Sequence, residues 1–331
     1  MNARKTVTLA LFALTLATPA LTQSGTAVQK KQTAPDPLAL LRPHWSHPAS
    51  SIGTKTSALD AVGMGLATAK VYRFTSADYP GAGLSVVFDE NTTTATVVGV
   101  FSFSSTSPET GFTLHGGVYQ TFSVPGSLPG GLLTGINTSG AMVGTYADTS
   151  DVSHGVLDVA GVFTNIDEPS GGTVPYDIND NGEIVGGYTD ISNVTHGFYT
   201  TDNGVTFTNF DFPGATSTIA AGVNTAGMIT GQWTDSTFNL HGFILNGGVF
   251  TSIDFPLATD TTAIGINDSN EVAGYYTDAT TTHGFIYSNG AFARVDVAGA
   301  AGTELSRIKN KGQVTGGYYD ATQELHAMTG H

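Results

Sequence analysis

Five aspartate–histidine pairs are the residues of this chain best suited to chemistry. In each pair the acid precedes the imidazole by five or six residues: Asp148 with His154, Asp190 with His196, Asp235 with His241, Asp278 with His283, and Asp320 with His326. Imidazole and carboxylate form a common metal-ligand set, and also a base with its orienting partner. An active site needs such a pair once, however, and not five times. We therefore interpret the pairs as structural hydrogen bonds, keep a ring of ligand or metal contacts as the alternative, and predict no catalytic residue.

The pairs belong to a repeat of about 43 residues that runs from about residue 84 to residue 331. Each of these five copies opens with a Gly-Ile-Asn-like segment, whose asparagines are Asn137, Asn179, Asn224, Asn267 and Asn310. A glycine, an aromatic residue (Tyr319 in the last copy), the aspartate and a His-Gly-Phe-like segment follow, and Phe-Thr-x-Ile-Asp-x-Pro closes the copy. A sixth, degenerate copy comes first and has Thr110 in the place of the histidine. We expect the asparagines to bond turn backbone, with a position along a central channel as the alternative.

The acidic residues match no complete metal motif. The segment from Asp177 to Glu183 resembles a calcium loop only superficially, because it lacks the ligand spacing and the terminal glutamate of an EF-hand. The 220 residues from Phe74 to Ala293 contain 21 Asp or Glu and no Lys or Arg. Their carboxylates therefore need backbone N–H groups, hydroxyls, histidines or cations as partners. We predict no cofactor, and we retain weak calcium binding as an option.

Turn residues divide each copy into four short strands, which in the fifth copy are about 262–267, 271–276, 283–288 and 291–297. Six such units predict an all-β repeat protein, a six-bladed β-propeller of four-stranded antiparallel blades, with a β-solenoid as the alternative. The last copy ends after its third strand, whereas residues 71–80 have the sequence of a closing strand. We therefore expect residues 71–331 to form one propeller domain, in which residues 71–80 complete the last blade.

The N-terminal residues predict export. Residues 1–22 are typical of a secretory signal peptide, since Arg4 and Lys5 precede an apolar run that is too short to span a bilayer. Residues 23–70 are rich in Thr, Ser, Ala, Pro and Gln and predict a flexible linker. The chain has no cysteine, which excludes disulfides, lipoprotein acylation and thiolate metal sites. We expect a secreted or periplasmic protein, and no later segment is apolar enough to span a membrane.

The formal net charge of −15 narrows the choice of partner. Nucleic-acid binding requires basic side chains that neutralise phosphates, and docking to an anionic membrane requires the same charge, so both are excluded. We expect a monomer with an acidic ring. Ring closure would also gather six basic residues into one positive sector at the last blade and its junction with the fifth: Lys70, Arg73, Arg294, Arg307, Lys309 and Lys311.

The segments Gly265-Ile266-Asn267 and His283-Gly284-Phe285 carry a resemblance to a known family. The chain resembles the extracellular repeat proteins named for a His-Ala-Phe motif, with glycine for alanine in most copies. The resemblance covers about residues 84–331 and implies secretion, but no particular activity.

Near-identical repeats without a unique polar constellation favour a binding or interaction module over an enzyme. We expect a protein or glycan ligand. The alternatives are a structural surface or matrix protein and, ranked last, a propeller hydrolase or lyase that acts on a polysaccharide or phosphoester.

Overall fold

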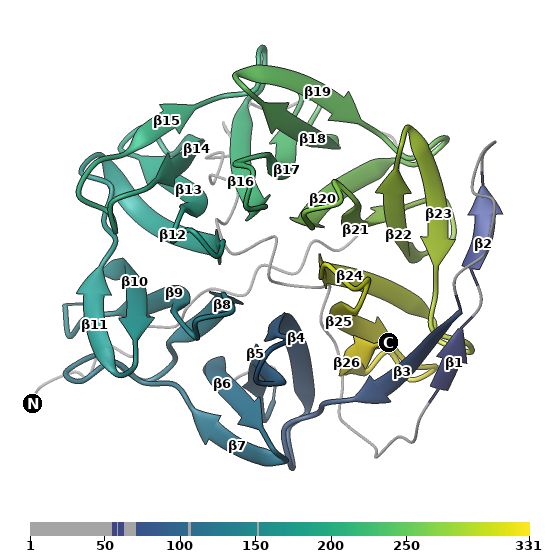
Figure 1. The fold of residues 1–331 in the computed structure, drawn as a ribbon, viewed down its shortest axis with the longest axis horizontal. Coiled ribbons are helices and arrows are strands. Elements are labelled where there is room, and N and C mark those ends of the chain that lie inside the picture. The colour runs from purple at the N-terminus through teal and green to yellow at the C-terminus, as the bar shows by residue number, and fades with distance from the viewer. Residues whose placement is uncertain (1–54, 58, 63–70, 105–106, 151) are drawn as a thin grey trace, which may run out of the picture. The chain divides into compact units, whose positions relative to one another are not determined.

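The computed structural model describes residues 55–57, 59–62, 71–104, 107–150 and 152–331. Within these ranges every regular element is a β-strand, and no helix there could cross a membrane. Six antiparallel blades form a ring, with the first strand of each blade nearest the centre (Figure 1). Five blades are built on four consecutive strands, and the sixth is completed by a strand from the N-terminal side. The predicted six-bladed β-propeller is confirmed, and the β-solenoid alternative is wrong.

The blades are numbered here in chain order. Blade 1 contains β4 (Leu84–Asn91), β5 (Thr96–Ser102), β6 (Thr110–His115) and β7 (Val118–Thr121). Blade 2 contains β8 (Leu132–Ile136), β9 (Met142–Ala147), β10 (Ser153–Val159) and β11 (Val162–Asn165). Blade 3 contains β12 (Gly171–Ile178), β13 (Ile184–Asp190), β14 (Thr195–Thr200) and β15 (Thr208–Phe210). Blade 4 contains β16 (Ser217–Val223), β17 (Ile229–Thr234), β18 (Leu240–Asn246) and β19 (Val249–Ile253). Blade 5 contains β20 (Asp260–Ile266), β21 (Val272–Thr277), β22 (Thr282–Ser288) and β23 (Ala291–Val295).

Blade 6 joins the two ends of the propeller. It contains β24 (Gly302–Ile308), β25 (Val314–Tyr319), β26 (Leu325–Gly330) and, from the N-terminal side, β3 (Tyr72–Ser76). Strand β3 pairs antiparallel with β26 and lies beside it in Figure 1. The rings of Tyr72 and Phe74 are buried by this pairing. The closing strand predicted within residues 71–80 is therefore confirmed, and we call the contact between β3 and β26 the seam.

Two short strands extend the outer edges of blades 5 and 6. Strand β1 (Lys55–Ser57) pairs with β3, and β2 (Leu59–Val62) pairs with β23. These residues fall within the range 23–70, for which the sequence predicts a flexible linker, so the structure differs from that prediction here. An outer strand has unpaired N–H and C=O groups on its free side, which an extended segment can satisfy. The predicted signal peptide at residues 1–22 and the rest of the linker lie outside the described residues.

The glycine of each second strand is required by close packing. A Cβ atom added to Gly186 would lie 2.2 Å from the carbonyl oxygen of Val174 and 2.6 Å from the ring of Phe198. Phe198 belongs to the His-Gly-Phe segment of the same blade and is fully buried. In blades 1, 3, 4 and 5 a glycine on the second strand thus packs against a phenylalanine ring on the third, which explains why both recur there. In blades 2 and 6 the ring is replaced by Val156 and Met328, and the carbonyl of the first strand alone requires the glycine.

Candidate functional site

In each of blades 2 to 6, a histidine lies between two aspartates; we call such a group of three a clasp. In blade 3 the first aspartate, Asp190, ends β13, and its Oδ1 accepts hydrogen bonds from the backbone N–H groups of Ser192 and Val194 at 2.8 and 2.9 Å. This caps the turn into β14. The other carboxylate oxygen, Oδ2, then lies 3.6 Å from Nε2 of His196. The predicted pair is thus brought together, but its contact is longer than a hydrogen bond.

The shorter contact of each histidine is made to an acid that sequence reasoning did not pair with it. Nδ1 of His196 lies 2.9 Å from Oδ2 of Asp211, which follows β15 in the closing Ile-Asp-x-Pro-like segment. The corresponding contacts are His154 with Asp167, His241 with Asp254, His283 with Asp296, and His326 with Asp78. The signal was available, since this acid recurs in nearly every closing segment. The clasp thus ties the third strand of a blade to its fourth.

An aromatic ring covers one face of each clasp histidine. The ring centroids of Tyr188 and His196 are 5.1 Å apart, and Tyr146, Trp233, Tyr276 and Tyr318 lie over the other four histidines. In the last copy the aromatic place is therefore taken by Tyr318, and the assignment of Tyr319 from the sequence is wrong. Trp233 is itself stacked on Phe212 at 4.3 Å, so both faces of its indole are occupied.

The clasp geometry changes the acidity of its members. Backbone N–H groups, above all that of Val194, lower the pKa of Asp190, because they stabilise the carboxylate. Hydrogen bonds from the Thr280 side chain and backbone lower the pKa of Asp278 to about 2. Burial on its own would lower the pKa of His154, but the hydrogen bonds and charges of Asp167 and Asp148 outweigh it and raise that pKa.

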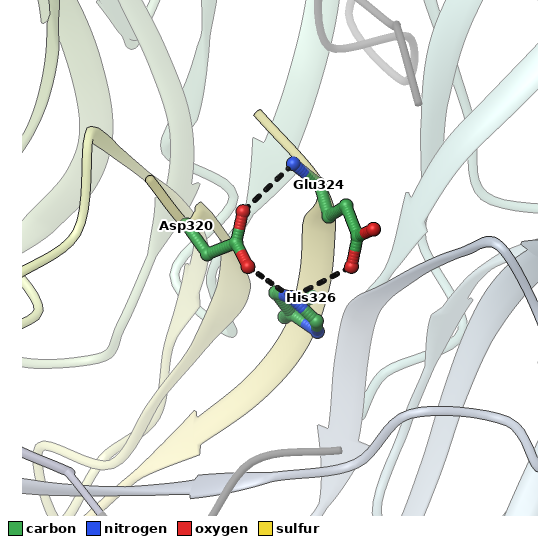
Figure 2. Close-up of side chains that lie close together, drawn as sticks. All are labelled: Asp320, Glu324 and His326. Carbon is green, nitrogen blue, oxygen red and sulfur yellow. Dashed lines mark hydrogen bonds and ion pairs between the residues drawn. The ribbon is translucent and has the colours of Figure 1, made fainter. Parts of the chain in front are cut away.

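The clasp of blade 6 differs from the others by a third carboxylate. Glu324 lies beside the ring of His326, with Oε2 4.0 Å from Nε2, while Oδ2 of Asp320 lies 3.6 Å from the same nitrogen (Figure 2). Within the part of the chain that the structure describes, these three residues form the one group whose donor atoms are placed to share a metal ion.

The asparagines form a ring of hydrogen bonds around the channel mouth, on the face opposite the clasps. Oδ1 of Asn179 accepts from the backbone N–H groups of Asn181 and Glu183 in its own turn. Its Nδ2 donates to the backbone oxygen of Asn224 in the next blade at 2.9 Å. Similar bonds between blades run from Asn91 to Asn137, from Asn137 to Asn179, from Asn224 to Asn267, and from Asn267 to Lys309. The asparagines therefore bond turn backbone and also line the channel.

Asn310 does not belong to this ring. The backbone N–H of Lys309 donates to the carbonyl of Gln313, as that of Asn267 donates to the carbonyl of Glu271, so Lys309 holds the asparagine place. Asn310 lies one position later and bonds the carboxylate of Asp268. The assignment of Asn310 from the sequence is therefore wrong. Lys309 and Asn310 are adjacent polar residues, and only the hydrogen-bond register shows which of them is equivalent to the repeat asparagine.

Three buried charged residues and one partly exposed lysine close the channel behind the asparagine ring. Arg307 takes the place of a repeat glycine, and its guanidinium donates to the carbonyl oxygen of Tyr176 across the ring at 2.6 Å. Its Nε lies 3.6 Å from Asp177. The ammonium of Lys309 is ion-paired with Asp89 of blade 1. We call these four residues the plug.

The plug fits because its neighbours at the same level are glycines. A Cβ at Gly265 would lie only 2.7 Å from Cα of Arg307. The recess that remains at the channel mouth has a volume of about 90 Å³. Arg307 and Lys309 thus pair with groups at the channel, and the predicted positive sector loses two of its six residues.

The fold is shared with solved structures of low sequence identity. AofleA from Arthrobotrys oligospora aligns with a TM-score of 0.52 and 13% identity, over 78% of this chain and 85% of that chain. TolB from Acinetobacter baumannii aligns with a TM-score of 0.52 and 11% identity, over 74% of this chain and 64% of its own. The six-bladed propeller lectin of Aleuria aurantia aligns with a TM-score of 0.48 and 8% identity, over 74% of this chain and 90% of its own. No protein-family model and no curated protein matches the sequence. At these identities, the likeness concerns the fold alone.

Proposed function

We propose that this chain is a secreted or periplasmic binding module that holds a protein partner on the face carrying the clasp loops. The observation behind this proposal is a row of exposed apolar side chains, one in the loop between the second and third strands of each of four consecutive blades. They are Phe103 (58% exposed), Val152 (50%), Ile191 (100%) and Phe238 (63%). Exposed apolar side chains at equivalent places in four consecutive blades support an interaction surface on this face.

The chemistry of this face favours a protein over a glycan. Val152 and Ile191 are aliphatic and offer no ring on which a sugar could stack, and both faces of Trp233 are covered. Phe103 and Phe238 are the exposed rings of the row, and they stand in different blades, separated by the aliphatic residues of blades 2 and 3. Beside the apolar row stand the half-exposed carboxylates of Asp211 and Asp254. A partner that presents apolar side chains within a basic rim would match this surface.

Export and family membership are parts of this proposal. The signal peptide expected at residues 1–22 supports a location outside the cytoplasm, and the His-Ala-Phe repeat resemblance supports the same location. The recess at the channel mouth is too small for an extended ligand, so the loop face is the surface we assign to binding.

The test compares two matched double variants. Ile191→Ser with Phe238→Ser removes two exposed apolar side chains from the clasp face. Val205→Ser with Val249→Ser removes two from the opposite face, one in a loop and one at the start of β19, where these side chains are 79% and 67% exposed. Immobilised wild type and both variants are exposed to secreted proteins of the source organism and, separately, to a glycan array.

We expect the wild type and the Val205/Val249 variant to retain the same protein partner, and the Ile191/Phe238 variant to lose it. Two lost apolar contacts cost at least about 2 kcal/mol, or about 30-fold in affinity. Binding only on the glycan array, or turnover of a polysaccharide or phosphoester, would overturn the protein-partner assignment. If all three proteins retain the partner equally, the binding surface does not include Ile191 and Phe238, and the assignment to the clasp face is wrong.

A further inference from the structure

The clasp of blade 6 has the donor set of a metal site. Oδ1 of Asp320 is used by the backbone N–H groups of Thr322 and Glu324, which leaves Oδ2 facing His326. Nδ1 of His326 is bonded to Asp78 at 3.0 Å, so Nε2 faces the two carboxylates. We propose that Asp320, Glu324 and His326 bind one divalent transition-metal ion of the zinc type (Figure 2).

Two of the three donors are buried without a hydrogen bond. His326 is 1% exposed and Glu324 is 6% exposed, yet neither Nε2 of the histidine nor Oε2 of the glutamate has a hydrogen-bond partner. A buried polar atom without a partner destabilises the fold, because nothing replaces the water that it loses. Both atoms point into the same small space, so one ion between them would satisfy both at once.

The spacing of the donors suits coordination better than direct bonding. Oδ2 of Asp320 and Oε2 of Glu324 lie 3.6 and 4.0 Å from Nε2 of His326, beyond hydrogen-bond length. Tetrahedral zinc with bonds of about 2.0–2.1 Å places its ligand atoms roughly 3.4 Å apart. All three donor atoms lie within 4.8 Å of one another, so a shift of the two carboxylates toward a common point would complete the site, with a fourth position left for water.

The third ligand is particular to blade 6. The backbone carbonyl of Glu324 accepts from the N–H of Asp320, and the same turn bond in the other clasps is accepted by Val152, Val194, Asn239 and Thr281. None of those four residues has a carboxylate. An aspartate and a histidine alone make a poor site, so the repeat supplies two ligands in every clasp and the substitution at Glu324 completes the set once.

Asp78 provides the outer partner that metal-bound histidines usually have. Its Oδ2 contacts Nδ1 of His326, and its Oδ1 accepts from the backbone N–H of Ala327 at 2.7 Å. A carboxylate on the far nitrogen fixes the ring orientation and makes the coordinating nitrogen more basic. Because Asp78 follows β3, an ion on His326 would also stiffen the seam.

The donor types select the ion. Imidazole suits zinc, cobalt or nickel, whereas calcium prefers six to eight oxygen ligands. The proposed site therefore differs from the weak calcium binding that the sequence leaves open.

Zinc titration of the metal-free full chain tests the proposal, by calorimetry and by the shift in melting temperature. The key variant is Glu324→Val, which gives blade 6 the residue found in blades 2 and 3. The control is His196→Gln, which breaks a clasp that has no third carboxylate. Glu324→Gln, which keeps the shape of the side chain, serves as a second variant in case the valine disturbs folding.

We expect one zinc ion per chain in the wild type and in His196→Gln, with a higher melting temperature on binding. Both Glu324 variants should weaken this site by more than 10-fold, and Asp78→Asn should weaken it by about 10- to 100-fold. Equal zinc affinity in the wild type and in a folded Glu324→Gln protein would overturn the proposal. So would loss of the site in His196→Gln, or calcium binding more tightly than zinc.

Discussion

The clasps and the plug use the same kinds of charged side chain in different ways. A clasp such as that of His196 repeats from blade to blade, is partly open to solvent, and joins neighbouring strands of one blade. The plug occurs once, is almost fully buried except for Lys309, and joins residues from opposite parts of the ring, as in the bond from Arg307 to Tyr176. The repeated clasps therefore hold each blade together and the repeated asparagines join neighbouring blades, whereas the plug, a departure from the repeat, connects opposite parts of the ring at its centre.

The seam offers the largest test of this difference, because blade 6 is assembled from strands at both ends of the propeller domain. Deletion of residues 71–80 removes β3 and uncovers β26. It also removes Asp78, so that Nδ1 of His326 loses its hydrogen-bond partner. The lost burial of Tyr72 and Phe74 alone should cost about 6–10 kcal/mol, which is comparable to the whole stability of a typical domain.

We therefore expect the deletion variant to be largely unfolded, as measured by circular dichroism and thermal melting. A chain that begins at residue 71 keeps β3 and serves as the control, which should stay folded. An unchanged melting temperature in the deletion variant would contradict the closed ring.

The plug provides the second test. Arg307→Gly gives blade 6 the glycine found in blades 2, 4 and 5, but it leaves Asp177 buried beside the channel without its counter-charge. Removal of one member of a buried ion pair costs about 3–5 kcal/mol. Denaturant unfolding should show a loss of this size, much larger than for any single change in a clasp.

The matched double variant separates charge from shape. Arg307→Gly together with Asp177→Gly restores the repeat residue at both positions and removes both charges. We expect it to recover at least part of the loss caused by Arg307→Gly alone. If the double variant is less stable than the sum of the two single changes predicts, the plug acts by filling space and the electrostatic account fails.

The sequence predicts the blades well and the plug poorly, for a physical reason. The period, the turn residues and the missing last strand are local signals, and they suffice for six blades and the closure by residues 71–80. The contact between Arg307 and Tyr176 joins residues 131 positions apart, and no local pattern announces it. In the sequence alone, a charged residue at a glycine position cannot be told from ordinary divergence of the repeat. Its role becomes visible only when the folded ring places its partner opposite it.

The clasps show the same limit on a smaller scale. Their loop acids are close in sequence to the histidines, and Asp190 was paired with His196 on that ground. The nearer carboxylate is Asp211, 15 positions away and in a different strand segment. Strand pairing decides this contact, so it could be found only by placing the predicted strands side by side and asking which recurring acid faces the histidine.

Glu304 on the inner strand of blade 6 gives a test of intermediate size. Burial raises its pKa from 4.5 to about 8, against the opposing effect of a hydrogen bond from Tyr319. A carboxyl group whose pKa is higher in the folded state stabilises the fold at low pH, and that contribution is lost as the pH rises from about 4.5 to about 8.

The wild type should therefore lose stability across this window, by at most about 1.4 kcal/mol per pH unit. Glu304→Gln, which cannot ionise, should give a flatter profile and be more stable than the wild type at pH 8. Unfolding curves at several pH values measure this. Parallel profiles for the two proteins would show that Glu304 is ionised in the fold.

A single clasp aspartate should have the smallest effect of all. Asp190→Ala removes the turn cap on Ser192 and Val194 together with the charge facing His196, whereas Asp190→Asn keeps an oxygen for the cap and removes only the charge. We expect alanine to lower the melting temperature modestly at neutral pH and asparagine to lower it less. The folded-state pKa of Asp190 lies below its ordinary value of 3.8, so its stabilising contribution is present above that value and disappears as the pH falls through the lower folded-state pKa. The difference between the wild type and the alanine variant should shrink accordingly in acid. A drop as large as that of Arg307→Gly would mean that the clasps carry the ring as well as the blades, and the division between repeated and unrepeated contacts would have to be abandoned.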